Sequence, residues 1–248
     1  MKNNPYADHG MGHISYSFLA SWVQSPWQAI GKLAGLEGSV GPAAYRGIAA
    51  ESGLEVAIKT GDLSQGIMAA EFEFDQRNLG DPKGEKERGK LASYVENAFG
   101  IYEHFGQYEA YQKKIVFQHE DLPIPFVGYI DFLYPDMIRD TKTVARNVYS
   151  NNPSTSHCRQ LAIYAFAYPD RDLWVDYVTP KETISHRVVN VEDHQRSVMK
   201  IIHGLEKFLS ISTDTQELAA ILTPDTDDWR FNDGIREQCA GIWPDITL

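Results

Sequence analysis

The sequence predicts an α/β fold in which helices flank a central mixed β-sheet. Two observations carry this prediction. Apolar residues recur at helical spacing over much of the chain from Ser15 to Phe105. From Gln107 onward, segments rich in β-branched and aromatic residues follow, with one helical segment between the third and the fourth of them. Helices, three strands, a helix and a further strand are the element order of an α/β protein.

Three helices are expected before the strands. Residues 15–36 begin with Ser-Tyr-Ser, which can cap a helix, and carry apolar side chains at near-helical spacing. Residues 43–59 follow a Gly-Pro pair and end before Gly61, a plausible C-terminal stop. A charged turn at 80–86 is expected to be exposed and to precede a third helix at 88–105.

The second half of the chain predicts the sheet. Strands are expected at residues 108–118, 126–134, 138–144 and 173–179, and a helix at 156–168. A further strand at 185–191 and a helix at 192–209 follow, the helix with apolar residues on one face.

Length and composition favour one domain. A chain of 248 residues with 43% hydrophobic content can bury a substantial core, and no internal repeat or long linker is visible. We expect a single domain over residues 1–248, with a core at about 43–180, an N-terminal helical segment at 13–36 and a C-terminal helical extension at 191–248.

Charge and cysteine content exclude several classes of protein. The net charge of −11 argues against a protein that binds nucleic acid over its whole surface, so a DNA site must be local. No apolar run approaches the roughly 18 to 20 residues of a membrane span, and the polar N-terminus lacks the apolar region of a secretory signal. Cys158 and Cys239 suit neither a disulfide scaffold nor a metal cluster. We therefore expect free thiols and a cytoplasmic location.

A predicted β-hairpin brings two acids and a lysine together. Pro135-Asp136 is favourable turn chemistry between the second and third strands. If the turn is centred on that pair, Asp131 lies directly across from Asp140. Side chains alternate along a strand, so Lys142 projects on the same side as Asp140.

This arrangement predicts a divalent cation site. Like charges opposite each other destabilise a sheet unless a cation neutralises them, and carboxylate oxygens favour Mg²⁺ or Mn²⁺. Such an ion can polarise a phosphate, while a neighbouring lysine positions or deprotonates the attacking water. The ordinary alternative is a solvated surface hairpin, which an Asp-x-Lys triplet by itself does not exclude. Asp136 is an alternative ligand, but it lies at the hairpin tip, so geometry favours Asp131.

Three motifs follow one another in the chain: Gly128-x-Ile-Asp131, then Ile138-Arg139-Asp140-Thr141-Lys142-Thr143, then Gln160-x-x-x-Tyr164. In this order they resemble the RecB-like and phage exonuclease branch of the PD-(D/E)XK nuclease superfamily. Weaker matches precede them at Ser15-Tyr-Ser17-Phe-Leu19 with Ser25-Pro26-Trp27, and at Arg46-Gly47-x-x-x-Glu51. The resemblance covers about residues 13–180 and implies a restriction-endonuclease-like core.

The resemblance also implies roles for individual residues. Glu51, Asp131 and Asp140 would bind one or two Mg²⁺ or Mn²⁺ ions, with the Thr141 carbonyl as a further ligand. Lys142 would serve the attacking water, and the pair formed by Gln160 and Tyr164 would orient DNA or the catalytic groups. Glu55, one helical turn beyond Glu51, is an alternative to it. Some relatives hold an iron–sulfur cluster through cysteines. This chain has Ser25 at one of those positions, so no cluster is expected.

Candidate DNA contacts lie beside the hairpin. Arg139, Arg146 and Arg159 make this stretch locally basic within an acidic protein, although an ordinary surface cluster is the alternative. Beyond DNA, the resemblance suggests a single-strand annealing or recombination protein as a partner. A homo-oligomer stays open.

The predicted function is therefore a metal-dependent deoxyribonuclease of a bacterial or phage-infected cell, acting in recombination, repair or DNA degradation. The choice of exonuclease rests on the resemblance alone. The alternatives are a catalytically silent DNA-binding or assembly subunit on the same fold, an endonuclease, and a phosphoesterase that acts on RNA.

Overall fold

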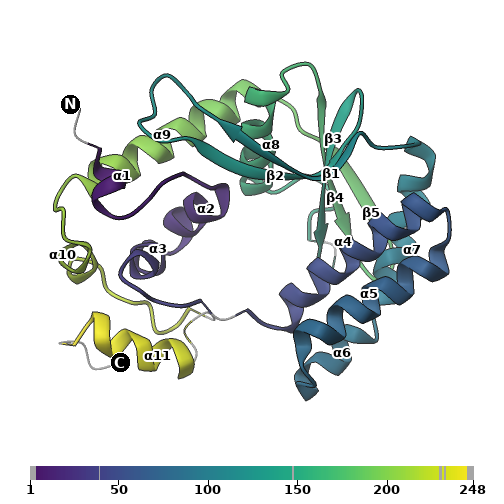
Figure 1. Cartoon of the computed structure of the whole chain (residues 1–248), viewed down its shortest axis with the longest axis horizontal. Coiled ribbons are helices and arrows are strands. Elements are labelled where there is room, and N and C mark those ends of the chain that lie inside the picture. Colours follow the sequence, from purple (N-terminus) through teal and green to yellow (C-terminus); the bar gives the residue numbers. More distant parts are fainter. Residues whose placement is uncertain (1–3, 39, 147, 229–230, 232, 245–248) are drawn as a thin grey trace. The chain divides into compact units, whose positions relative to one another are not determined.

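A computed structural model describes residues 4–38, 40–146, 148–228, 231 and 233–244. The chain forms two compact units (Figure 1). The first unit contains residues 1–39, 115–128 and 193–248, and the second contains residues 40–114 and 129–192. The expected single nuclease domain stays a prediction, because compactness alone does not define a nuclease domain.

The first unit consists mainly of helices from the two ends of the chain. They are α1 (Pro5–Asp8), α2 (Tyr16–Gln24), α3 (Pro26–Leu33), α9 (Val191–Leu209), α10 (Thr215–Ala220) and α11 (Asp233–Ile242). The single helix expected at 15–36 is two helices, because the chain leaves helical geometry at Ser25 and restarts at Pro26. Ser15 caps the first of them, since its hydroxyl accepts a hydrogen bond from the Phe18 amide.

The second unit carries a group of helices and most of the sheet. Its helical elements are α4 (Pro42–Thr60), α5 (Leu63–Asn78), η1 (Pro82–Gly84), α6 (Glu85–Arg88), α7 (Leu91–Tyr102), η2 (Glu103–Phe105) and α8 (Thr155–Ala167). The expected helix at 43–59 is confirmed, and Gly61 ends it in the left-handed conformation with φ of 69°. The helix expected at 88–105 is instead a short α6, then α7 and a final 3₁₀ turn.

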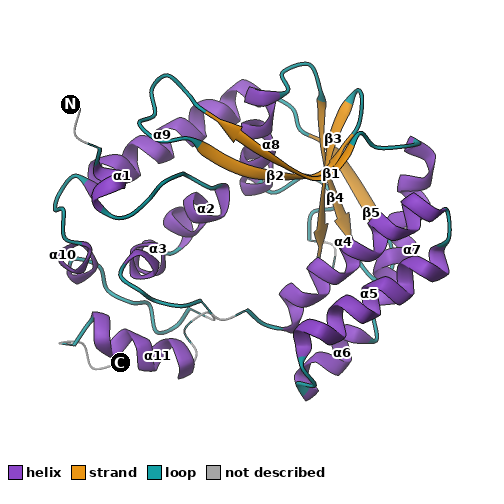
Figure 2. Ribbon diagram, viewed as in Figure 1, coloured by secondary structure: helices purple, strands orange, loops and turns teal. Residues whose placement is uncertain are grey.

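A five-stranded open sheet confirms the predicted α/β class. The strands, orange in Figure 2, are β1 (Ala110–Phe117), β2 (Phe126–Leu133), β3 (Met137–Thr143), β4 (Asp172–Val178) and β5 (Thr183–Arg187). Their order in the sheet is β1-β2-β3-β4-β5. The β2–β3 and β4–β5 pairs are antiparallel, whereas β3 and β4 are parallel. The sheet is therefore mixed, and α8 is the crossover that makes a parallel pair feasible.

Two glycines allow α4 and α5 to pack closely. A Cβ atom on Gly53 would lie 2.5 Å from the backbone oxygen of Gly66, and a Cβ on Gly66 would lie 2.6 Å from Gly53 oxygen. Only glycine leaves room for this backbone contact. The helices of this group surround a core that includes Leu54, Phe74 and Tyr94.

Within the described part of the chain, no helix is long and apolar enough to cross a membrane. Cys158 and Cys239 are buried free thiols, as the sequence predicts.

Candidate active site

The hairpin formed by β2 and β3 has the predicted register. Phe132 pairs with Arg139 and Leu133 with Ile138, which places Asp131 opposite Asp140 when the ladder is continued by one residue. The Asp131 carboxylate accepts a hydrogen bond from the Thr141 amide at 2.9 Å. Asp136 lies in the exposed turn, away from these acids.

Asp140 and Lys142 form a close ion pair on β3. The two lie two residues apart, so their side chains share one face of the strand. Lys142 Nζ is 2.6 Å from Asp140 Oδ2. Asp140 Oδ2 is itself buried, so this ion pair is shielded from solvent. The Asp140 side chain is 1% exposed.

Helix α8 brings Gln160 and Tyr164 to the same place. Gln160 Nε2 donates to Asp140 Oδ1 at 3.1 Å and also lies 3.0 Å from the Tyr164 hydroxyl. That hydroxyl donates to the Tyr129 carbonyl of β2 at 2.7 Å. Because residues four apart lie on one helix face, α8 contributes an amide that fixes Asp140 and a tyrosine that anchors the helix to the sheet.

Helix α4 supplies Glu51, which Gln112 of β1 connects to Asp131. The Gln112 amide nitrogen hydrogen-bonds Glu51 Oε1 and lies 3.4 Å from Asp131 Oδ1. Gln112 has φ of 46°, a left-handed conformation that is unfavourable for a residue with a side chain. Strained backbone of this kind persists where surrounding contacts hold it, and it is common at functional sites.

Burial and mutual repulsion disfavour the charged forms of the acids. Burial, then the charges of Asp140 and Glu51, raise the pKa of Asp131 well above its usual value. Burial also raises the pKa values of Asp140 and Glu51. Burial alone lowers the pKa of Lys142, but the charges of Asp140 and Asp131 outweigh it and raise that pKa. The neighbouring acids therefore favour the ammonium form of Lys142.

The donor chemistry of this cluster suits a hard divalent cation. Carboxylate oxygens are the preferred ligands of Mg²⁺, and Asp131, Asp140 and Glu51 bring them to this cluster. In the arrangement described here, however, no three His, Cys, Asp or Glu side chains of the described residues converge at ligand distances. Contacts with Lys142 and Gln112 separate the oxygens of Asp140, Asp131 and Glu51, so an ion would have to displace these donors.

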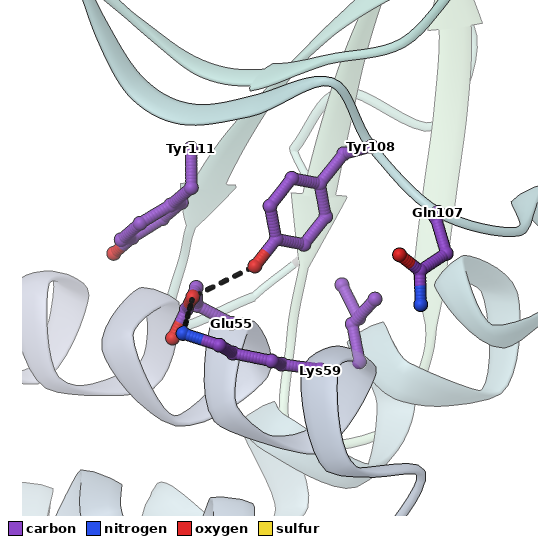
Figure 3. A pocket seen from close by; sticks show the side chains of 6 residues that line it. Glu55, Lys59, Gln107, Tyr108 and Tyr111 are labelled. Atoms are coloured by element: carbon purple, nitrogen blue, oxygen red, sulfur yellow. Dashed lines mark hydrogen bonds and ion pairs between the residues drawn. The ribbon is translucent and has the colours of Figure 1, made fainter.

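Glu51 and Glu55 lie on one face of α4 but have different partners. Glu51 meets Gln112 and is within the electrostatic influence of Asp140 and Lys142. Glu55 instead accepts a hydrogen bond from the Tyr108 hydroxyl at 2.7 Å and lines a separate pocket (Figure 3). The geometry thus favours Glu51 over Glu55 as the α4 acid of the cluster.

Arg139 requires a correction, since it is not available to bind DNA phosphates. Its side chain is 3% exposed, and its Nε and Nη2 contact the Asp176 carboxylate at 2.9 and 2.5 Å. Ser185 and Tyr102 hydroxyls donate to the same carboxylate, each at 2.6 Å. The guanidinium also lies 4.1 Å from the ring centroid of Phe105. Arg139 belongs to the hydrogen-bonded interior of the sheet.

The remaining predicted residues differ in exposure. Arg146 is exposed and Arg159 is half-buried, and contact of either residue with DNA stays a prediction. The Thr141 hydroxyl pairs with the Tyr102 hydroxyl at 3.0 Å, on the face away from Lys142. Use of the Thr141 carbonyl as a ligand also stays a prediction.

Sequence reasoning missed Gln112, Tyr111 and Asp176. Gln112 carries no local signal, because its position depends on the left-handed backbone inside β1. Tyr111 directly precedes Gln112 in β1, and burial, then the charges of Glu51 and Asp131, raise its pKa. Asp176 could have been noticed as an acid inside the apolar stretch of β4, since such residues are usually paired.

Comparison with known proteins gives little further information. No family model matches the chain, and no curated protein matches it. Among solved structures, the chain is similar to a crystal structure of a protein called SSO0001, with 13% sequence identity over 80% of this chain and 83% of that one. The TM-score of this match is 0.42.

Proposed function

We propose that this chain is a metal-dependent deoxyribonuclease with a restriction-endonuclease-like core, and that it acts as an exonuclease. The observation that carries the proposal is the buried cluster in which Lys142 lies 2.6 Å from Asp140, while Gln112 contacts both Glu51 and Asp131. A cluster of buried acids with a lysine is costly for folding, and a catalytic role accounts for its presence. The choice of DNA, and of an exonuclease, rests on the sequence resemblance.

In this proposal the chain's own groups divide the work. Asp131, Asp140 and Glu51 hold one or two Mg²⁺ or Mn²⁺ ions, which when bound polarise the phosphate and acidify a water. Lys142, an ammonium, hydrogen-bonds the attacking water and stabilises negative charge on the phosphate. Gln160 fixes one Asp140 oxygen, so the other oxygen keeps its direction toward the cluster.

A silent DNA-binding subunit on the same fold is the second candidate. It is favoured by one observation, that no three potential ligand side chains of the described residues converge at ligand distances. In this case the Asp140–Lys142 pair would be structural, and the chain would not bind Mg²⁺.

Digestion of DNA tests the proposal. End-labelled linear DNA and closed circular DNA are incubated with Mg²⁺, Mn²⁺ or EDTA, and wild type is compared with Lys142→Ala and Asp131→Asn. The matched controls are Asp136→Asn, in the exposed turn of the same hairpin, and Lys113→Ala, an exposed residue of β1.

We expect metal-dependent loss of linear DNA in the wild type and in both controls, and a loss of activity of at least about 100-fold in Lys142→Ala and Asp131→Asn. If the wild type also cuts closed circular DNA, the protein is an endonuclease rather than an exonuclease. Absence of wild-type activity on DNA, together with no effect of Mg²⁺ on the melting temperature, would favour the silent subunit. Digestion of RNA alone would identify the RNA-directed phosphoesterase.

A further inference from the structure

A pocket of about 420 Å³ lies beside the acid cluster, in the same unit of the chain. Its lining residues are Glu55, Ile58, Lys59, Gln107, Tyr108 and Tyr111. Figure 3 shows Glu55 and Lys59 of α4 on one side of it and Gln107, Tyr108 and Tyr111 on the other. Ligand pockets for small molecules have volumes of about 300 to 1,000 Å³, so this one has room for a group of nucleoside size.

The pocket has two aromatic walls that neighbouring side chains hold in place. The rings of Tyr108 and Tyr111 lie 5.7 and 5.2 Å from the ring of Phe132, centroid to centroid. Phe132 is fully buried, so it anchors both rings. The hydroxyl of Tyr108 is also fixed by its hydrogen bond to Glu55. Fixed rings of this kind bind planar aromatic ligands at little entropic cost.

Polar groups with unused hydrogen-bonding capacity lie in the same pocket. Glu55 uses only Oε1, which contacts the Tyr108 hydroxyl at 2.7 Å and Lys59 Nζ at 3.9 Å. Among the described residues, neither Glu55 Oε2 nor the side-chain amide of Gln107 has a partner. A carboxylate acceptor and an amide that both donates and accepts can pair with the edge of a nucleobase.

The pocket is connected to the acid cluster through Tyr111. This tyrosine lines the pocket, and the next residue of β1, Gln112, hydrogen-bonds Glu51 Oε1 and lies 3.4 Å from Asp131 Oδ1. Glu55 is one helical turn from Glu51 on α4. Lys59 lies at the rim, 71% exposed, where it can meet a phosphate without displacing a buried group.

We propose that the pocket binds one nucleobase of the nucleic acid strand, with its ring against Tyr108 and Tyr111 and its polar edge on Glu55 and Gln107. This inference rests on the proposed nuclease function and assigns it a base-binding subsite next to the reacting phosphate. Because recognition uses the aromatic face and one edge, the subsite tolerates different bases and senses chiefly whether a base is present.

The test measures binding of a fluorescein-labelled single-stranded oligothymidylate by anisotropy, with Ca²⁺ in place of Mg²⁺ to slow hydrolysis. The intact oligonucleotide is compared with versions that carry one abasic site at each position in turn. The variant is Gln107→Ala, which removes an exposed side chain without a described partner. Its matched control is Gln76→Ala, an exposed glutamine of α5 that does not line the pocket. Tyr108→Phe, which keeps the ring and removes the hydroxyl, serves as a second variant.

An abasic site at one position is expected to weaken wild-type binding about tenfold. Gln107→Ala should weaken binding of the intact strand about fivefold and leave binding of that abasic strand unchanged, whereas Gln76→Ala should affect neither. Tyr108→Phe should retain the dependence on the base. Thymidine monophosphate, added as a competitor, distinguishes a base in the strand from a released nucleotide. If the competitor displaces the labelled oligonucleotide, and does so less well with Gln107→Ala, the pocket binds the released nucleotide. If the competitor does not displace the oligonucleotide, the pocket binds a base of the strand.

Two results would overturn the proposal in distinguishable ways. If wild type degrades DNA with Mg²⁺ but no abasic position weakens binding, or Gln107→Ala weakens all strands equally, the subsite is wrong and the nuclease function stands. If wild type neither degrades DNA nor binds the oligonucleotide, both fail together.

Discussion

Replacing Asp176 with asparagine should destabilise the protein strongly. The Asp176 side chain is fully buried. Its carboxylate accepts hydrogen bonds from Nε and Nη2 of Arg139 and from the hydroxyls of Ser185 and Tyr102. Asp176→Asn removes the charge that balances a guanidinium only 3% exposed. Removal of one partner from a buried ion pair costs about 3–5 kcal/mol, since the remaining charge stays desolvated. A domain with a free energy of unfolding of about 5–15 kcal/mol would lose a large share of it.

The measurement is urea unfolding followed by tryptophan fluorescence. Trp174 is a suitable reporter, because its ring lies 5.2 Å from the Arg139 guanidinium. With a urea dependence of about 2 kcal/mol per molar, the loss corresponds to a midpoint about 2 M lower. Asp172→Asn is the matched control, since it breaks an ion pair to Arg187 that is also 2.5 Å long but half-exposed. Exposed pairs contribute at most about 1 kcal/mol, so this midpoint should move by less than about 0.5 M.

The result also decides how Arg139 acts. A midpoint for Asp176→Asn within about 0.5 M of wild type would refute the structural role argued from burial. If an Arg139→Met variant instead keeps its stability but binds DNA more weakly, the result would support the phosphate contact that the sequence suggested.

Three further outcomes are expected. Gly53→Ala should cost about 1–3 kcal/mol, because its new methyl meets the Gly66 backbone, whereas Gly100→Ala in α7 has open space and should be neutral or stabilising; equal thermal melts would contradict this. Gln112→Gly should relieve about 1 kcal/mol of left-handed strain and free the oxygens it contacts, so Mg²⁺ should raise the melting temperature of this variant more than that of wild type. In EDTA, the contribution of Asp131 to the free energy of unfolding should fall as pH rises above about 4, because the unfolded chain then ionises Asp131 while burial and neighbouring acids raise the pKa of this group in the folded state. Asp131→Asn should flatten that dependence, and an unchanged pH profile would contradict the assignment.

Local chemistry made the hairpin predictable from the sequence. The Pro135-Asp136 turn and the two-residue alternation together determine which residues face each other, and both act over a few neighbouring positions. The pairing of Phe132 with Arg139 confirms that register. The position of Asp131 opposite Asp140 therefore needed no knowledge of the rest of the fold.

Helix α5 and the Gln112 contact were not predictable in the same way. The buried residues of α5 are Gly66, Ala70 and Phe74, one per turn, and two of them are too small to mark an apolar stripe. Close backbone packing against α4 holds this helix in place, and such packing leaves no periodic apolar pattern in the sequence. Gln112 reaches Glu51 and Asp131 only because tertiary contacts hold it at φ of 46°.

Arg139 and Lys142 show how far the alternation rule reaches. Lys142 is two residues from Asp140, so the two side chains share one face of β3. Arg139 is two residues from Thr141, whose side chain points to the opposite face. The same rule that assembled the cluster therefore excludes Arg139 from it, and charge alone was a misleading reason to include it. With Arg139 paired to Asp176, Arg146 and Arg159 stay predicted phosphate contacts beside the hairpin, together with Lys142 of the proposed cluster. Because the chain carries a net charge of −11, contacts with the nucleic acid should be few, and its affinity should depend only weakly on salt.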